Sequence, residues 1–94
     1  MQNGQFTDEK IRWEIKRLIA SVTEREPEEV SDTASFVEEL GIDSLMAMEV
    51  MVSMDKKFRI DIPEDEFIKA TNVEEAAAMV RRYLPESAST IANA

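Results

Sequence analysis

Residues 38–67 read EELGIDSLMAMEVMVSMDKKFRIDIPEDEF, and this stretch decides the fold. It passes from a glycine-containing loop into a long apolar run of helix-favouring residues. An acidic or hydroxyl side chain at such a junction is typical of a helix N-cap, so we expect a helix to begin near Asp43 or Ser44 and to run to about Phe58. The β-branched residues and proline that follow predict a break and then a short third helix with Pro63 at its first position.

Apolar side chains occupy two faces of this predicted helix, at about 100° per residue. The core face comprises Ala47, Val50, Met51, Met54 and Phe58. Leu45, Met48 and Val52 lie on a second face, beside Glu49. This second face fits a wide stripe in a small bundle, and it also fits a docking surface for another protein.

Two further long helices are predicted, one on each side of this segment. Thr7 is a suitable N-cap for the first, with Phe6 and Ile11 at the spacing of a hydrophobic staple. Asn72 and Glu75 resemble a capping box that opens the last. The apolar stripes are Ile11, Ile15, Leu18, Ile19 and Val22 in the first helix, and Val73, Ala76, Ala77, Val80 and Leu84 in the last.

The fold class predicted from these segments is all-α, a small four-helix bundle with a long first loop and a short third helix. We expect residues 7–84 to form the domain, 1–6 a flexible N-terminus and 85–94 a flexible C-terminal tail. Trp13 lies opposite the stripe of the first helix and should be partly exposed. A loop as long as residues 24–42 has to be anchored in a compact domain. Its apolar residues for this purpose are Val30, Phe36, Val37 and Leu40.

The composition limits the partners and the chemistry. Twenty Asp and Glu against 11 Lys and Arg give a formal net charge of −9, which would repel a nucleic acid or an anionic membrane and attract basic surfaces. No apolar run is long enough for a membrane span or a signal peptide, so a cytoplasmic protein is expected. With no Cys, the chain has no disulfide and no thiolate of its own.

Ser44 is the residue whose role is least obvious. A Ser at a helix start is ordinarily a capping or first-turn residue. Because Asp43 can provide the cap, the Ser44 hydroxyl would be left at the helix N-terminus, where backbone N–H groups and the helix dipole favour an attached or bound phosphate. GIDSL is also similar to the GDSL block of one lipase class, but that chemistry needs a His base and the chain contains no His. No calcium-binding loop motif is present, and we expect no metal site.

Several motifs together resemble the acyl carrier protein family. They are ASFVEELGIDSL at residues 34–45, the Glu49–Val50 pair, FRIDIPEDE at 58–66 and ATNVEEAAAMV at 70–80. The resemblance covers roughly residues 7–84. It implies that Ser44 bears a covalent 4′-phosphopantetheine arm whose terminal thiol holds an acyl group as a thioester. It therefore implies a carrier and not an enzyme.

The same resemblance implies that the second helix recognises partner proteins. The docking residues would be Asp43, Leu45, Met48, Glu49, Val52 and Lys56. The implied partners are a phosphopantetheinyl transferase (a holo-acyl-carrier-protein synthase) and then acyl-transferring or ketoacyl synthase enzymes with basic docking patches, from fatty-acid or related lipid or polyketide biosynthesis. We expect the carrier itself to be a monomer.

The sequence departs from the family pattern in three places. Lys56 and Lys57 stand where acids are usual, and Met46 stands where a polar residue is common, so we expect an altered partner preference. At about 100° per residue, Lys56 lies close to Glu49 on the docking face and Lys57 is turned away. The small residues at 76–78 favour close helix packing over room for an acyl chain.

Two alternatives stay open on the sequence. One is a peptidyl or aminoacyl carrier protein, although an Asp before the Ser favours the acyl type. The other, from a different class, is an acidic helical adaptor whose second helix binds a partner without any modification.

Overall fold

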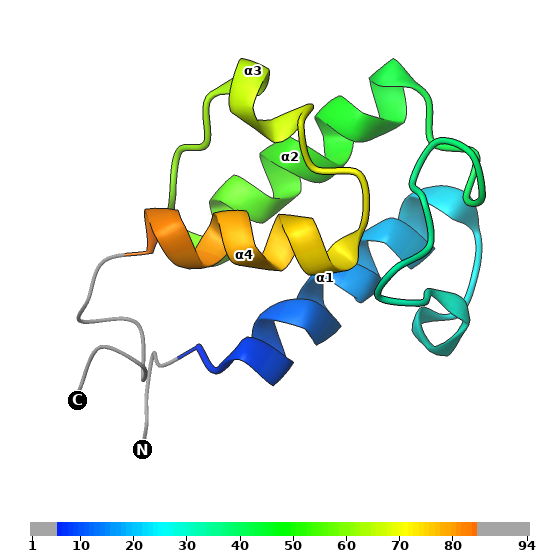
Figure 1. Cartoon of the computed structure of the whole chain (residues 1–94), viewed down its shortest axis with the longest axis horizontal. Coiled ribbons are helices and arrows are strands. Elements are labelled where there is room, and N and C mark those ends of the chain that lie inside the picture. Colours follow the sequence, from blue (N-terminus) through cyan, green and yellow to red (C-terminus); the bar gives the residue numbers. More distant parts are fainter. Residues whose placement is uncertain (1–5, 85–94) are drawn as a thin grey trace.

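The computed structural model of the chain describes residues 6–84, which form four α-helices and one short 3₁₀ turn without a β-strand in that range. The elements are α1 (Asp8–Thr23), η1 (Pro27–Glu29), α2 (Ser44–Phe58), α3 (Glu64–Phe67) and α4 (Val73–Tyr83). Helix α1 packs against both α4 and α2. Residues 24–43 join α1 to α2 and form the long connection, which lies at the end of the bundle where α1 finishes and α2 begins (Figure 1). The predicted fold class is confirmed. The terminal segments expected to be flexible lie outside the described residues, apart from Phe6.

Helix α1 begins where its cap predicts. The Thr7 hydroxyl oxygen accepts a hydrogen bond from the Lys10 N–H at 3.1 Å. Ile11, Ile15 and Ile19 are fully buried, whereas Trp13 keeps 41% of its surface exposed. The amphipathic pattern therefore predicts correctly which face of this helix is buried, because only one of its faces is apolar enough to enter the core.

Helix α2 supplies the centre of the core. Val50, Met54 and Phe58 are buried on the predicted face, and the Phe6 ring meets the Phe58 ring edge-to-face with centroids 5.1 Å apart. Ala47 and Met51 from the same predicted face are only partly buried. These two side chains line a pocket, together with the buried Val50.

The caps of α3 and α4 differ in detail from the prediction. Pro63 occupies the N-cap position of α3 and not its first helical position. The Asn72 side chain caps α4 by accepting the Glu75 N–H at 2.8 Å, as expected. The Glu75 carboxylate, however, accepts from the N–H and the hydroxyl of Thr71 and not from the N–H of Asn72. The backbone N–H of Thr71, and then its hydroxyl, lowers the pKa of Glu75.

The alanines of α4 pack closely, as predicted. Ala76 and Ala77 are buried in the core, and the pocket beside α2 does not include them. Small side chains let α4 approach α1.

The long connection is held by an ion cluster and by backbone hydrogen bonds. The Asp32 carboxylate lies 2.6 Å from Arg12 Nη1 and 2.5 Å from Lys16 Nζ, both on α1. The Phe36 N–H donates to the Thr71 carbonyl at 2.8 Å, which ties the connection to the segment before α4. Gly41 then takes a φ of +72°, a left-handed conformation that favours glycine, and the chain turns into α2.

Three of the four predicted anchors of this connection are buried, and one prediction is wrong. Val30, Phe36 and Leu40 are in the core. Val37 is 68% exposed. Phe36 and Val37 are adjacent, and here only one of the two side chains turns inward.

Neutralising Asp32 should reveal how much the ion cluster stabilises the fold. The hydrogen bond from Lys16 lowers the pKa of Asp32, burial raises it, and the hydrogen bond from Arg12 lowers it further; the net shift is downward. The contribution is therefore present above the unfolded-state pKa and is lost as pH falls through the folded-state value. We expect Asp32→Asn to cost about 1 kcal/mol at pH 7, or roughly 4–8 °C in Tm.

The difference in Tm between Asp32→Asn and the wild type should begin to shrink below about pH 4, near the unfolded-state pKa of Asp, and should close once the folded-state carboxylate, whose pKa is lower, is also protonated. Thermal unfolding followed by circular dichroism between pH 3 and 7 measures it. Glu38→Gln, which neutralises an exposed acid on the same connection, is the control. A constant deficit across this pH range would show that the charge of Asp32 does not stabilise the connection.

Candidate functional site

Ser44 is the first residue of α2 and is exposed to solvent. Asp43 caps the helix, since its carboxylate accepts the Met46 N–H at 2.9 Å. Within residues 6–84 the Ser44 hydroxyl makes no hydrogen bond to another residue. The hydroxyl is thus accessible at the positive end of the helix dipole, where an attached phosphate is favoured.

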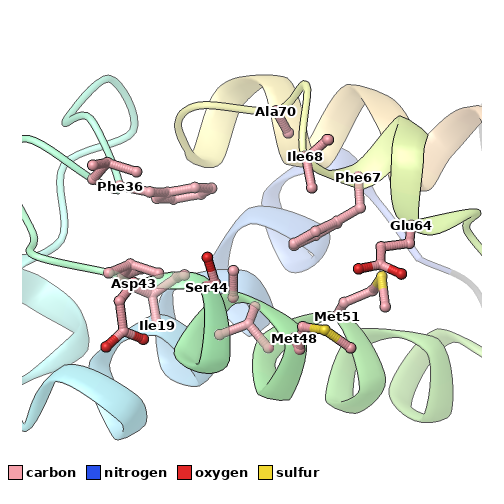
Figure 2. Close-up of a pocket in the computed structure, with 14 residues that line it drawn as sticks. Ile19, Phe36, Asp43, Ser44, Met48, Met51, Glu64, Phe67, Ile68 and Ala70 are labelled. Atoms are coloured by element: carbon pink, nitrogen blue, oxygen red, sulfur yellow. The ribbon is translucent and has the colours of Figure 1, made fainter.

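An apolar pocket of about 430 Å³ opens beside Ser44, between α2 and the segment that contains α3. It is lined by Ile19, Phe36, Val37, Ile42, Asp43, Ser44, Ala47, Met48, Val50, Met51, Glu64, Phe67, Ile68 and Ala70. Figure 2 shows Ser44 at one end of this pocket, Glu64 and Met51 at the other, and the rings of Phe36 and Phe67 entering from opposite sides. All of the lining residues except Asp43, Ser44 and Glu64 are apolar, so the pocket suits an uncharged hydrocarbon group.

Exposed apolar side chains surround the entrance to the pocket. Val37, Met48 and Ile68 each line it and are exposed to solvent. Sequence reasoning placed Val37 in the core and did not identify Ile68. A signal for Ile68 exists, because Phe67 and Ile68 are adjacent at the end of a four-residue helix and both cannot face inward.

The predicted docking residues form one exposed face of α2 and its cap. Asp43, Leu45, Met48, Glu49, Val52 and Lys56 are all exposed, and their spacing along the helix places them on neighbouring turns. Leu45, at 70% exposure, is the most exposed large apolar residue among those described. The second apolar face of α2 is therefore exposed and is not part of the core. This excludes the interpretation that the second face widens the core stripe of α2.

The two lysines near the end of α2 have different surroundings. Lys57 Nζ lies 3.5 Å from Glu14 Oε1 of α1. Lys56 forms no ion pair with any described residue and is exposed. Lys57 is thus turned away from the docking face, as predicted, and it contacts α1, which partly balances its charge. The charge of Lys56 faces solvent.

Asp55 holds the connection that leads from α2 to α3. Its Oδ1 accepts a hydrogen bond from the Ile62 N–H at 3.3 Å. Burial raises the pKa of Asp55, the bond from Ile62 opposes this rise, and neighbouring Asp61 adds to it. By fixing residues 59–62, this bond helps to set the position of α3 at the edge of the pocket.

Two kinds of feature are absent from residues 6–84. Their His, Cys, Asp and Glu side chains form no group of three or more that could hold a metal ion. None of their helices is long and apolar enough to cross a membrane.

The family model described as a phosphopantetheine attachment site matches residues 13–80, which include the connection, Ser44, α2 and most of α4. The chain belongs to this family. Its members are carrier domains for a covalent 4′-phosphopantetheine group. The chain is therefore a phosphopantetheine carrier protein, and the resemblance to acyl carrier proteins is confirmed at the level of the family. An unmodified adaptor is not supported.

The residues around Ser44 fit this prosthetic group. Its hydroxyl is exposed and free of hydrogen bonds to the other described residues, at a helix terminus that favours a phosphoester. When attached, the group supplies the thiol that a chain without Cys lacks.

Proposed function

We propose that this chain is an acyl carrier protein that holds acyl intermediates as thioesters on a phosphopantetheine arm attached to Ser44. One observation carries the proposal: the exposed Ser44 lines one end of an apolar pocket of about 430 Å³. A site of attachment and a place to shelter a hydrocarbon group thus lie side by side. The carrier would present these groups to enzymes of fatty-acid or related lipid or polyketide biosynthesis.

The chain itself contributes no base for the attachment. It has no His, and the Asp43 carboxylate accepts the Met46 N–H. A hydroxyl without a base is a weak nucleophile at neutral pH. Formation of the phosphoester is therefore assigned to a phosphopantetheinyl transferase, and Ser44 acts as its substrate.

The pocket lining favours an acyl group over an aminoacyl or peptidyl group. An α-ammonium group loses its hydration on entering an apolar cavity, and this costs free energy unless a carboxylate pairs with it. Glu64 is the one carboxylate at the end of the pocket far from Ser44, and it is exposed to water. An aliphatic chain requires no such partner and gains free energy from each buried methylene.

The docking face of α2 suits an enzyme with an apolar centre and charged surroundings. Leu45, Met48 and Val52 supply exposed apolar area around Glu49. Asp43 and Glu49 would pair with a basic rim on the enzyme, which mainly raises the rate of association and is weakened by salt. Lys56 opposes such a rim, so we assign the best fit to a partner with an acid opposite this lysine.

Ser44→Ala should abolish attachment of the arm without unfolding the protein, because the cap of α2 comes from Asp43. Intact mass is measured after incubation with coenzyme A, Mg²⁺ and a promiscuous phosphopantetheinyl transferase. Wild type and the control Ser53→Ala, which lies on the same helix, should each gain one phosphopantetheine. Modification of Ser44→Ala, or none of the wild type, would refute the assignment.

Octanoyl-loaded protein should melt at a higher temperature than the same protein with a free thiol. A few methylenes buried at about 0.8 kcal/mol each correspond to roughly 10 °C in a domain of this size. Ala47→Phe fills the pocket and should remove this increment, whereas Val52→Phe adds the same ring on the exposed side of α2 and should preserve it. A glycyl thioester should give no increment; an equal increment for glycyl and octanoyl would favour the aminoacyl alternative.

Lys56→Gln should speed acyl transfer with a generic ketoacyl synthase by about two- to fivefold at low salt, because one unfavourable charge leaves the docking face. Lys57→Gln removes the same charge beside Glu14 and should change the rate little. Lys56→Glu should give the largest increase, and all differences should diminish in high salt. Equal rates for the wild type and the three variants would show that this end of α2 does not select partners.

A further inference from the structure

The solvent side of α1 carries an exposed aromatic residue. Trp13 is the sole Trp of the chain and lies opposite the buried Ile11, Ile15 and Ile19. Exposed Trp side chains are uncommon away from binding surfaces, because the indole contributes a large apolar area and a hydrogen-bond donor. The residues around Trp13 therefore indicate what it could contact.

Trp13 borders a second groove, of about 480 Å³, formed by α1 and the residue Asp32 of the long connection. Its lining residues are Thr7, Glu9, Lys10, Arg12, Trp13, Lys16 and Asp32. None of them lines the pocket beside Ser44. A partner bound at this groove would leave the pocket and the exposed face of α2 free.

On one side of Trp13 the positive charge exceeds the negative charge. The carboxylate of Glu14 is shared by Lys10 at 3.8 Å, Arg17 at 3.7 Å and Lys57 at 3.5 Å. Glu14 is buried, whereas the three cations remain about half-exposed. One carboxylate cannot balance three cations, so an excess positive charge is presented to solvent here.

On the other side of Trp13 the cations form ion pairs that hold elements of the fold together. Arg12 bridges Asp8 and Asp32, Lys16 pairs with Asp32, and Arg81 of α4 also pairs with Asp8. With Glu9, a further acid of the groove, three acids face three cations, so the charges on this side balance. The excess positive charge of the α1 surface therefore lies around Glu14, within a chain whose net charge is −9.

We propose that the surface formed by Lys10, Trp13 and Arg17 is a second docking site, which binds an acidic segment of a partner protein that also carries an apolar side chain. The acids would pair with Lys10 and Arg17, and the apolar side chain would cover the Trp13 ring. The rest of the chain repels such a segment, so its binding would be confined to α1. This partner has the opposite charge to the basic enzymes assigned to α2.

The probe is a synthetic peptide of alternating glutamate and leucine, titrated into the full chain. Trp13 is the only Trp, so its fluorescence reports contact at this surface alone. We expect a saturable blue shift of the emission that weakens as salt is added. The same peptide with lysine in place of glutamate should give no shift.

Variants locate the binding. Lys10→Gln combined with Arg17→Gln should weaken binding of the acidic peptide by about tenfold. Lys69→Gln combined with Arg82→Gln removes the same charge from two other exposed cations and should leave binding unchanged. Retained binding in the α1 variant, equal response to the lysine peptide, or no shift at millimolar acidic peptide would overturn the proposal.

Two other occupants of the surface have distinct signatures. An emission shift that depends on protein concentration without peptide would assign the surface to a second copy of the chain. A shift with phosphatidylglycerol vesicles and none with the acidic peptide would assign it to an anionic membrane. Either result would replace the proposed acidic segment.

Discussion

The hydrogen bond from the Met46 N–H to the Asp43 carboxylate is the interaction on which the site depends. A helix start needs a side chain that accepts from its free N–H groups, and in many helices a Ser at this place performs that role. Here Asp43 performs it one residue earlier. Ser44 is therefore both inside the first turn, close to the positive end of the dipole, and free to carry a group.

The two ends of α2 differ in how closely they are packed. Its end near Phe58 packs against α1 and Phe6 and is closed to solvent. Its beginning, around Ala47 and Met51, faces a short α3 that does not fill the space, and the pocket results. Dense packing at one end stabilises the fold, and the looser end next to Ser44 can admit a hydrocarbon group. Stability and the proposed carriage of an acyl group thus depend on different parts of the same helix.

Acidic and basic side chains are also concentrated on different elements of the fold. The long connection and α3 are acidic, and the connection is held because Asp32 meets Arg12 and Lys16 of α1. The remaining cations of α1 and Lys57 gather around Glu14. A strongly acidic chain therefore presents a positive surface on α1, and the two proposed partners, of opposite charge, would meet different sides of the molecule.

Much of the helical structure and the position of Ser44 could be predicted from the sequence, because helix periodicity and helix caps depend on nearby residues. The stripe of α1, the beginning of α2 and the place of Ser44 relative to Asp43 each depend on residues within a few positions of one another. The detailed cap at Glu75 was not predicted, since Thr71 offers its carboxylate two donors while Asn72 offers one. Local capping rules identify the possible hydrogen-bond donors to a side chain such as Glu75, but they do not say which donor it will bind.

Sequence alone determined the fold class, the four helices, the exposed Trp13 and the attachment candidate Ser44. Only the tertiary structure decided that Val37 and Ile68 surround a pocket, that Ala47 and Met51 line it, and that three cations share Glu14. Each of these depends on how a loop or a four-residue helix sits against α2, or on which side chains of α1 and α2 meet. Short segments carry too few residues for periodicity to specify a face, and contacts between helices depend on relative placement that no local pattern encodes.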